Sequence, residues 1–205
     1  MQKINLFVSY YQTKDEERQA ELDFCRANHE ESGLFDNIIP FNDRPTYNDF
    51  FKATKDFPTD INVLTNADIY FNDTINLCQS MGVRDAYALT RWEDREGEAI
   101  WFDNMHTYNK HAKSQWSQDV WIFRGAVNGI NSPFHLGVPG CDNRIAYDIF
   151  RAGYNLTNPS KKIKCIHKHK EMERSYNIPL IYKHGKVPRP WKPVPVDEVQ
   201  ERKPI

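Results

Sequence analysis

The strongest constraint on the fold is a regular alternation of apolar, strand-like stretches with helical ones through roughly the first half of the chain. Strands are predicted at residues 4–10, 38–41, 61–64 and 86–90, and helices at residues 14–28, 47–54 and 74–81. Parallel neighbouring strands must be joined by a crossover, which is usually a helix. The alternation therefore predicts an α/β fold, a sandwich of helices around a mixed, mostly parallel central sheet.

This alternation ends after Arg91. A short antiparallel strand is predicted at residues 98–102, a buried strand at 118–125, a helix at 143–152, and further strands at 154–157 and 163–166. Residues 106–116 are polar and lack a clear period, which is typical of a segment that covers a site or moves over it. Gly153 is expected to end the helix at 143–152.

The composition is that of a globular protein. A chain of 205 residues can form one domain with a full core. No apolar run approaches the roughly 20 residues of a membrane span, and the amino terminus predicts a strand, not a signal peptide. The four cysteines form no paired motif, so neither a zinc knuckle nor a disulfide framework is indicated. The expected compartment is a reducing cytoplasm, that of the host if the protein is viral.

Polar side chains follow the predicted strand at residues 61–64. They are Asn66, Asp68, Asn72 and Asp73. Carboxylate and amide oxygens at the carboxyl end of a strand suit Mg²⁺ or Mn²⁺, which could neutralise the charge of a departing phosphate. Asn72 and Asp73 could equally make turns and cap the next helix. Asp68 differs from them, because it lies between apolar segments where an unpaired carboxylate is costly.

Four polar residues later in the chain are candidates for chemistry. Asp119, at the start of a buried strand, is either the partner of an arginine or a carboxylate with a raised pKa suited to proton transfer. Asp142 could serve a reaction, cap the helix that follows, or do both. His167 and His169 alternate on a predicted strand and so point to the same side, as ligands would. A solvated surface pair is the alternative.

Residues at two predicted strand ends suggest a nucleotide site. Tyr10 and Tyr11 end the first strand and could stack on a nucleobase. Asp43 and Arg44 lie beside them in the predicted sheet and could bind the polar edge of the base and the phosphates. The alternative is that both tyrosines belong to the core or its rim.

The net charge of −1 conceals an asymmetry. Residues 160–193 hold ten lysines and arginines against two glutamates, a local charge of +8. Such segregation suggests a basic surface and an anionic partner, with a solvated tail as the alternative. Residues 1–176 are expected to form the domain, and residues 177–205 a basic, Pro-rich C-terminal extension whose proline run would be extended.

Three of these motifs, taken in order, resemble the glycosyltransferases of the GT-A fold. They are the strand followed by Asn66-Ala-Asp68-Ile-Tyr, the Gly-Cys-Asp142-Asn-Arg turn that opens a helix, and the late His167-x-His169. The resemblance runs from the first strand to about Tyr176. In that family a strand-ending Asp-x-Asp motif and a late histidine hold Mn²⁺ or Mg²⁺ against the diphosphate of a nucleotide sugar, and a later acidic turn faces the acceptor.

The resemblance implies that Asp68 and His167 bind the metal and that Asp142 is the acceptor-side acid or base. This chain has Asn66 at the first position of the Asp-x-Asp motif. That departure weakens the predicted metal affinity and leaves open a mechanism that uses arginine and lysine in place of a metal.

A full set of site residues follows from the motifs and the resemblance together. The catalytic residues are expected to be Asp142 and Asp119. The donor, a nucleotide sugar of the UDP type, is expected to contact Tyr10, Tyr11, Asp43, Arg44, Asn66, Asp68 and Arg91. The acceptor is expected to contact Trp92, His135, Asn143, Arg144, His169 and Arg174.

The expected reaction is transfer of a glycosyl group to a hydroxyl. Small transferases of this kind resemble those with which phages decorate hydroxymethylated DNA bases, and the basic stretch beside His167 favours that acceptor over a glycan. One alternative is a metal-dependent phosphoesterase or nuclease using Asp68, Asp73 and His167. Another is a nucleic-acid-binding module without chemistry, built on the basic stretch and its aromatic residues Tyr176, Tyr182 and Trp191.

Overall fold

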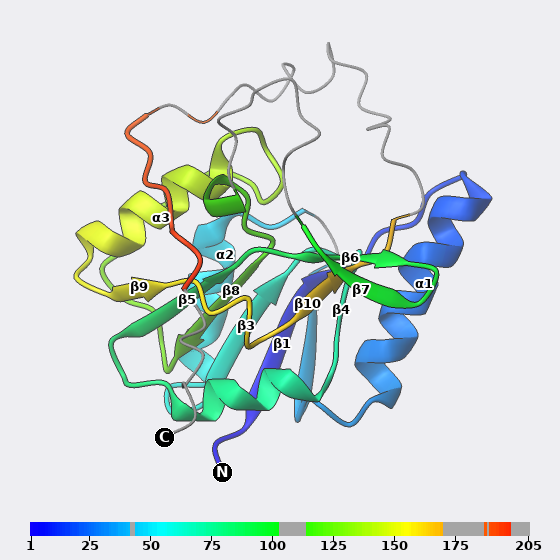
Figure 1. The fold of residues 1–205 in the computed structure, drawn as a ribbon. Coiled ribbons are helices and arrows are strands. Elements are labelled where there is room, and N and C mark those ends of the chain that lie inside the picture. Colours follow the sequence, from blue (N-terminus) through cyan, green and yellow to red (C-terminus); the bar gives the residue numbers. More distant parts are fainter. Residues whose placement is uncertain (42–43, 103–113, 170–186, 188, 198–205) are drawn as a thin grey trace, which may run out of the picture.

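The central sheet of the computed structural model has six strands in the order β2-β1-β3-β8-β5-β9 (Figure 1). Residues 1–41, 44–102, 114–169, 187 and 189–197 are described. The strands are β1 (Ile4–Ser9), β2 (Asn37–Phe41), β3 (Ile61–Thr65), β5 (Asp85–Leu89), β8 (Val120–Arg124) and β9 (Asn155–Thr157). Strand β8 is antiparallel to both of its neighbours, whereas the other adjacent pairs are parallel. The predicted α/β class with a mixed, mostly parallel sheet is confirmed.

A second, smaller sheet has the order β4-β10-β6-β7. Its strands are β4 (Ile69–Phe71), β6 (Trp92–Arg95), β7 (Glu98–Trp101) and β10 (Cys165–His167). Strand β10 pairs antiparallel with β4 and parallel with β6, so His167 lies opposite both Ile69 and Glu93. Strand β7 is the antiparallel strand predicted at residues 98–102. Strand β4 was not predicted, because three residues carry no readable period.

The α-helices are α1 (Glu16–Glu31), α2 (Tyr47–Ala53) and α3 (Cys141–Arg151), with 3-10 helices η1 (Thr54–Asp56), η2 (Asp73–Ser80) and η4 (Ser114–Trp116). Asp15 caps α1, and Thr46 with Asp49 forms a reciprocal capping box on α2. Within the described ranges, no helix is both long enough and apolar enough to cross a bilayer.

Two of these helices differ from the sequence predictions. The helix predicted at residues 74–81 is the 3-10 helix η2, and Asn72 caps it by accepting a hydrogen bond from the Thr74 backbone at 3.2 Å. Helix α3 begins two residues before the predicted start. Its N-cap is Gly140, in a left-handed conformation, so Asp142 lies within the first turn and does not cap the helix.

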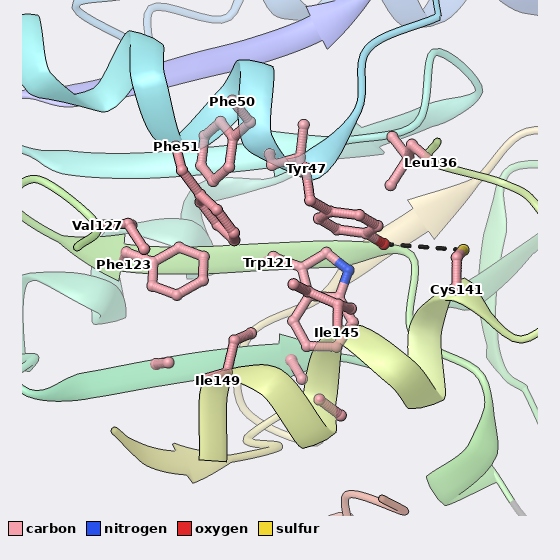
Figure 2. Close-up of a cluster of buried hydrophobic side chains, with 14 of the residues drawn as sticks. Tyr47, Phe50, Phe51, Trp121, Phe123, Val127, Leu136, Cys141, Ile145 and Ile149 are labelled. Carbon is pink, nitrogen blue, oxygen red and sulfur yellow. Dashed lines mark hydrogen bonds between the residues drawn. The ribbon is translucent and has the colours of Figure 1, made fainter. Parts of the chain in front are cut away.

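Hydrophobic side chains cover both faces of the central sheet, because successive residues of a strand point to opposite sides. On one face, Phe7, Leu64 and Trp121 pack with the apolar sides of α2 and α3. Figure 2 shows this cluster gathered between the two helices over β8. On the other face, Leu6, Val63 and Ile122 pack against α1, η2 and the small sheet. Strand β8 runs opposite to β3, so its start lies beside the carboxyl ends of β1 and β3. These strand ends lie between the two packed layers.

The C-terminal residues that are described lie on the domain. Val187 and Val194 are buried in the same cluster as α3. Backbone N–H groups of this segment donate to Pro139, Asn143, Gln115 and Asn158. Trp191 packs so closely on Gly140 that a Cβ atom added to that glycine would lie 2.8 Å from the indole. The segment thus holds the first turn of α3 in place.

Two glycine substitutions should measure this contact. Gly140 and Gly153 both have left-handed backbones, with φ values of 84° and 82°, but a Cβ added at Gly153 meets nothing within 4 Å. Gly153→Ala should cost about 1–2 kcal/mol of unfolding free energy for the backbone alone. Gly140→Ala should cost a further ~1–3 kcal/mol because it displaces Trp191. Urea denaturation measures both losses. Equal losses, or an extra loss that persists in a Trp191→Ala background, would contradict the contact.

Candidate active site

Asp68 follows β3 and binds two cationic side chains from other parts of the chain. Arg18, from the first turn of α1, donates to its Oδ2 at 2.5 Å. His167, at the end of β10, places Nε2 at 3.2 Å from the same oxygen. The antiparallel register of β4 and β10 produces this contact, because it sets His167 opposite Ile69, the residue after Asp68.

A second group of charges continues from His167 toward β8. Nδ1 of His167 lies 3.0 Å from the Glu93 carboxylate, whose other oxygen accepts from Arg91 at 2.7 Å. Arg91 also donates to Asp119 at 3.1 Å, and the Asn66 amide donates to the other oxygen of Asp119 at 3.1 Å. Asp119 is therefore the partner of an arginine, the first of the two alternatives. The carboxylates and cations alternate from Arg18 to Asp119.

Burial and charge pairing together shift the pKa values of the residues in this row. Burial opposes ionisation of Asp68, but the hydrogen bond and charge of His167 and the charge of Arg18 hold the pKa of Asp68 well below its usual range. His167 is likewise buried, yet its hydrogen bonds to Asp68 and Glu93 raise its pKa to about 9. His167 is thus an imidazolium at neutral pH, and both of its ring nitrogens donate.

Asp68 and His167 already have partners within the protein. Oδ2 of Asp68 accepts from Arg18 and from His167. No group of three histidine, cysteine, aspartate or glutamate side chains among the described residues is placed to hold an ion. Binding of Mn²⁺ or Mg²⁺ stays a prediction of the sequence, and the cations Arg18 and His167 stand where the ion was expected.

Asp142 lies near the β8 end of this row. Its carboxyl accepts a hydrogen bond from the Cys141 thiol at 3.0 Å and another from the backbone of Gln118. Burial and the negative charge of Asp119 raise the pKa of Asp142 to about 7. A carboxyl that titrates near neutrality can both accept and donate a proton under ordinary conditions. Asp142, and not Asp119, is the carboxyl suited to acid–base work.

The predicted donor-binding residues separate into two groups. Asn66, Asp68 and Arg91 belong to the charged row, and the hydroxyl of the exposed Tyr11 lies 3.3 Å from Arg18, beside it. Tyr10 points elsewhere, because its hydroxyl is bonded to the buried His29 at 2.9 Å.

Arg44 lies apart from the charged row. It lines a surface groove of about 600 Å³ with Phe41 and residues of α2 and η1. Asp43, its predicted companion, is outside the described residues.

The predicted acceptor-binding residues are also spread out. Asn143 adjoins Asp142, whereas Arg144 is paired with Asp148 at 2.9 Å. His135 is bonded to the Arg44 carbonyl and therefore belongs with the groove. Arg174 is outside the described residues.

The remaining two acceptor candidates are Trp92, in β6, and His169, which follows β10. His169 stacks edge-on with His167, 5.5 Å between ring centroids, and its Nδ1 lies 3.8 Å from Glu21. Trp92 donates to the Ser160 carbonyl and packs against Trp101, with Lys161 and Lys164 over the two indoles.

Three residues of the site were not predicted from the sequence: Arg18, Glu93 and Gln118. Arg18 lies on a helix fifty positions before Asp68, and its i, i+3 pairing with Glu21 is an ordinary surface pattern of helices. Glu93 reaches His167 only through the pairing of β6 with β10.

Comparison of the sequence with models of known protein families gives no match, and comparison with curated proteins gives no significant relative. The fold and the site define an α/β protein with a row of alternating charges that leads to a carboxyl titrating near neutrality.

Proposed function

We propose that the protein is a glycosyltransferase of the GT-A type, which moves a sugar from a nucleotide-sugar donor to a hydroxyl. The observation that carries the proposal is the position of Asp142 beside a row containing the cations Arg18, His167 and Arg91. Transfer of a sugar from a nucleotide diphosphate needs positive charge at the leaving group and a base at the acceptor. The cations of the row supply the positive charge, and the Asp142 carboxyl beside it supplies the base.

In this mechanism each side chain has one task. Arg18 and His167 neutralise charge that develops on the departing diphosphate, and Asp68 holds both in position. The Asp142 carboxylate accepts the proton of the acceptor hydroxyl as the bond from that oxygen to the sugar carbon forms and the bond from the sugar carbon to the diphosphate breaks. Arg91 holds Asp119 beside Asp142, and the negative charge of Asp119 keeps the Asp142 carboxylate basic.

A thermal-shift screen of nucleotide sugars, with and without Mn²⁺, tests the proposal. A ligand that binds the folded state at 100 times its Kd stabilises it by about 2.7 kcal/mol, so the correct donor should raise Tm clearly. Arg18→Gln should abolish most of that shift. Arg26→Gln is the matched control, because Arg26 is on the same helix in an exposed pair with Glu30. Absence of a shift with every nucleotide sugar, with or without metal, would overturn the proposal.

The acceptor we propose is a hydroxymethylated base in DNA, with a glycan as the alternative. Its support is the +8 charge of residues 160–193. Because phosphate contacts release counterions, log K for duplex DNA should fall with log salt by about 0.9 per contact. Replacing Lys161 and Lys164 together by Gln should flatten that slope, whereas Lys3→Gln should not. Binding to DNA that is weak and independent of salt would favour the glycan.

A further inference from the structure

Within the described part of the chain, two buried amide oxygens near Asp142 lack a hydrogen-bond partner. Gln118 is 2 % exposed and Asn143 is 9 % exposed. Oε1 of Gln118 and Oδ1 of Asn143 accept no hydrogen bond from any described residue. Native proteins satisfy nearly all of their buried polar atoms, so two orphaned acceptors beside a candidate catalytic carboxyl need an explanation.

The orientation of both amides is fixed by one turn. The amide nitrogen of Gln118 donates to the Gln115 carbonyl at 2.9 Å, and that of Asn143 donates to the Trp116 carbonyl at 3.3 Å. Both carbonyls belong to η4. Flipping either amide would bring its oxygen against a carbonyl oxygen, so each nitrogen must face η4 and each oxygen must face away from it.

The neighbouring groups make the surroundings of these oxygens rich in acceptors. Asn143 follows Asp142 directly, and the backbone of Gln118 is bonded to the Asp142 carboxyl. Asp119, next to Gln118, is already satisfied by Arg91 and Asn66. An anion would be repelled here. A ligand that donates hydrogen bonds would satisfy both orphaned oxygens.

We propose that Gln118 and Asn143 form a recognition subsite, beside Asp142, for an uncharged ligand group that donates at least two hydrogen bonds. A sugar diol has this chemistry, and so does a hydroxymethylated cytosine with its exocyclic amine. The inference rests on the proposed function, in which Asp142 faces the acceptor hydroxyl. It adds that the acceptor is held by its own donors next to the hydroxyl that reacts, and that phosphates bind elsewhere.

The test is an NMR titration of the side-chain amide resonances of the intact wild-type protein. The probes are methyl α-glucoside and 5-hydroxymethyl-deoxycytidine, with inorganic phosphate as the anionic comparison. The amide signals of Gln118 and Asn143 should shift and saturate with one of the two neutral probes, which identifies the source of the donors. Phosphate should shift neither signal.

The chain supplies an internal control. Asn158 is fully buried but fully paired, with its amide donating to Thr90 and Val194 and its oxygen accepting from Thr90 and Ser160. Its signals should not move. Asn143→Leu should weaken binding of the effective probe at least tenfold, and unchanged Asn158 signals in that variant would show that it is folded. Shifts with neither neutral probe, or shifts with phosphate alone, would overturn the subsite.

The outcomes separate this inference from the proposed function. Stabilisation by a nucleotide sugar without any shift of the Gln118 and Asn143 signals would leave the transferase standing and remove the subsite. Saturable shifts with a neutral probe, in a protein that no nucleotide sugar stabilises, would keep the subsite and remove the transferase.

Discussion

Replacing Asp142 by asparagine is expected to slow sugar transfer by about 10²–10⁴-fold, the usual contribution of a positioned general base. Asparagine has nearly the same shape but cannot accept the acceptor proton. In the wild type the rate should rise as the pH increases through about 7, where Asp142 ionises. The residual rate of the variant should lack that rise. Initial rates between pH 5 and 9 measure both effects.

The same substitution should not destabilise the fold. The pKa of Asp142 is raised from 3.8 to about 7, so the folded state binds more protons than the unfolded state between these values. Stability therefore falls as the pH rises through that window, and Asp142→Asn should remove this contribution. Asp85→Asn is the control and should keep full activity, because Asp85 begins β5 and so lies at the opposite end of the strands from Asp119. A variant that loses stability at pH 8 but keeps normal activity per folded molecule would assign Asp142 a structural role.

Asp68→Asn should have the second large effect, on both stability and transfer. It leaves Arg18 and His167 without their shared anion. Breaking a buried pair costs about 3–5 kcal/mol, and the lower value is expected because the Asp68 side chain is 17 % exposed. Transfer should fall steeply, since the two cations lose their fixed positions. Urea denaturation and initial rates measure the two losses, and Glu30→Gln, in an exposed pair, should cost well under 1 kcal/mol.

The pKa of His167 provides a second test of the Asp68→Asn substitution. The pKa of His167 is raised from 6.5 to about 9, so the stability from its pairing is complete below pH 6.5 and is lost as the pH rises through 9. Of the two carboxylates that contact His167 in the described structure, Asp68→Asn leaves Glu93, and the pKa of His167 should fall. NMR titration of its ring protons measures this shift. An unchanged pKa would mean that Asp68 does not hold the imidazolium.

The parts of the fold that the sequence predicted are those with a local pattern. Apolar strands and amphipathic helices have a readable period, so the α/β class and the mostly parallel sheet could be predicted. Strands at residues 98–102 and 163–166 were predicted, close to β7 and β10, but the small sheet that they form was not, because β4 is three residues long and pairs with β10 across more than ninety positions. The start of α3 was placed too late, since the glycine that caps it offers no side-chain acceptor.

The site residues, like the strands and helices, could be predicted only where the local sequence carries a signal. Asp68 and Asp142 could be singled out as acidic residues at strand and helix ends, which is a property of their sequence neighbours. The tertiary contacts could not, because Arg18 reaches Asp68, Glu93 reaches His167 and the backbone of Gln118 reaches Asp142 only through the packing of distant elements. Whether a strand-end carboxylate faces a metal or an arginine depends on elements far away in the chain.

The position of β8 also has a consequence for synthesis of the chain. Strands β1, β2 and β3 can pair as soon as residue 65 has left the ribosome, but the free edge of β3 receives its partner only with Val120–Arg124. Until then an apolar strand, Ile61–Thr65, presents unpaired backbone groups, a template for pairing with another nascent chain. Chains that end before β8 should therefore aggregate, and those that extend past it should not.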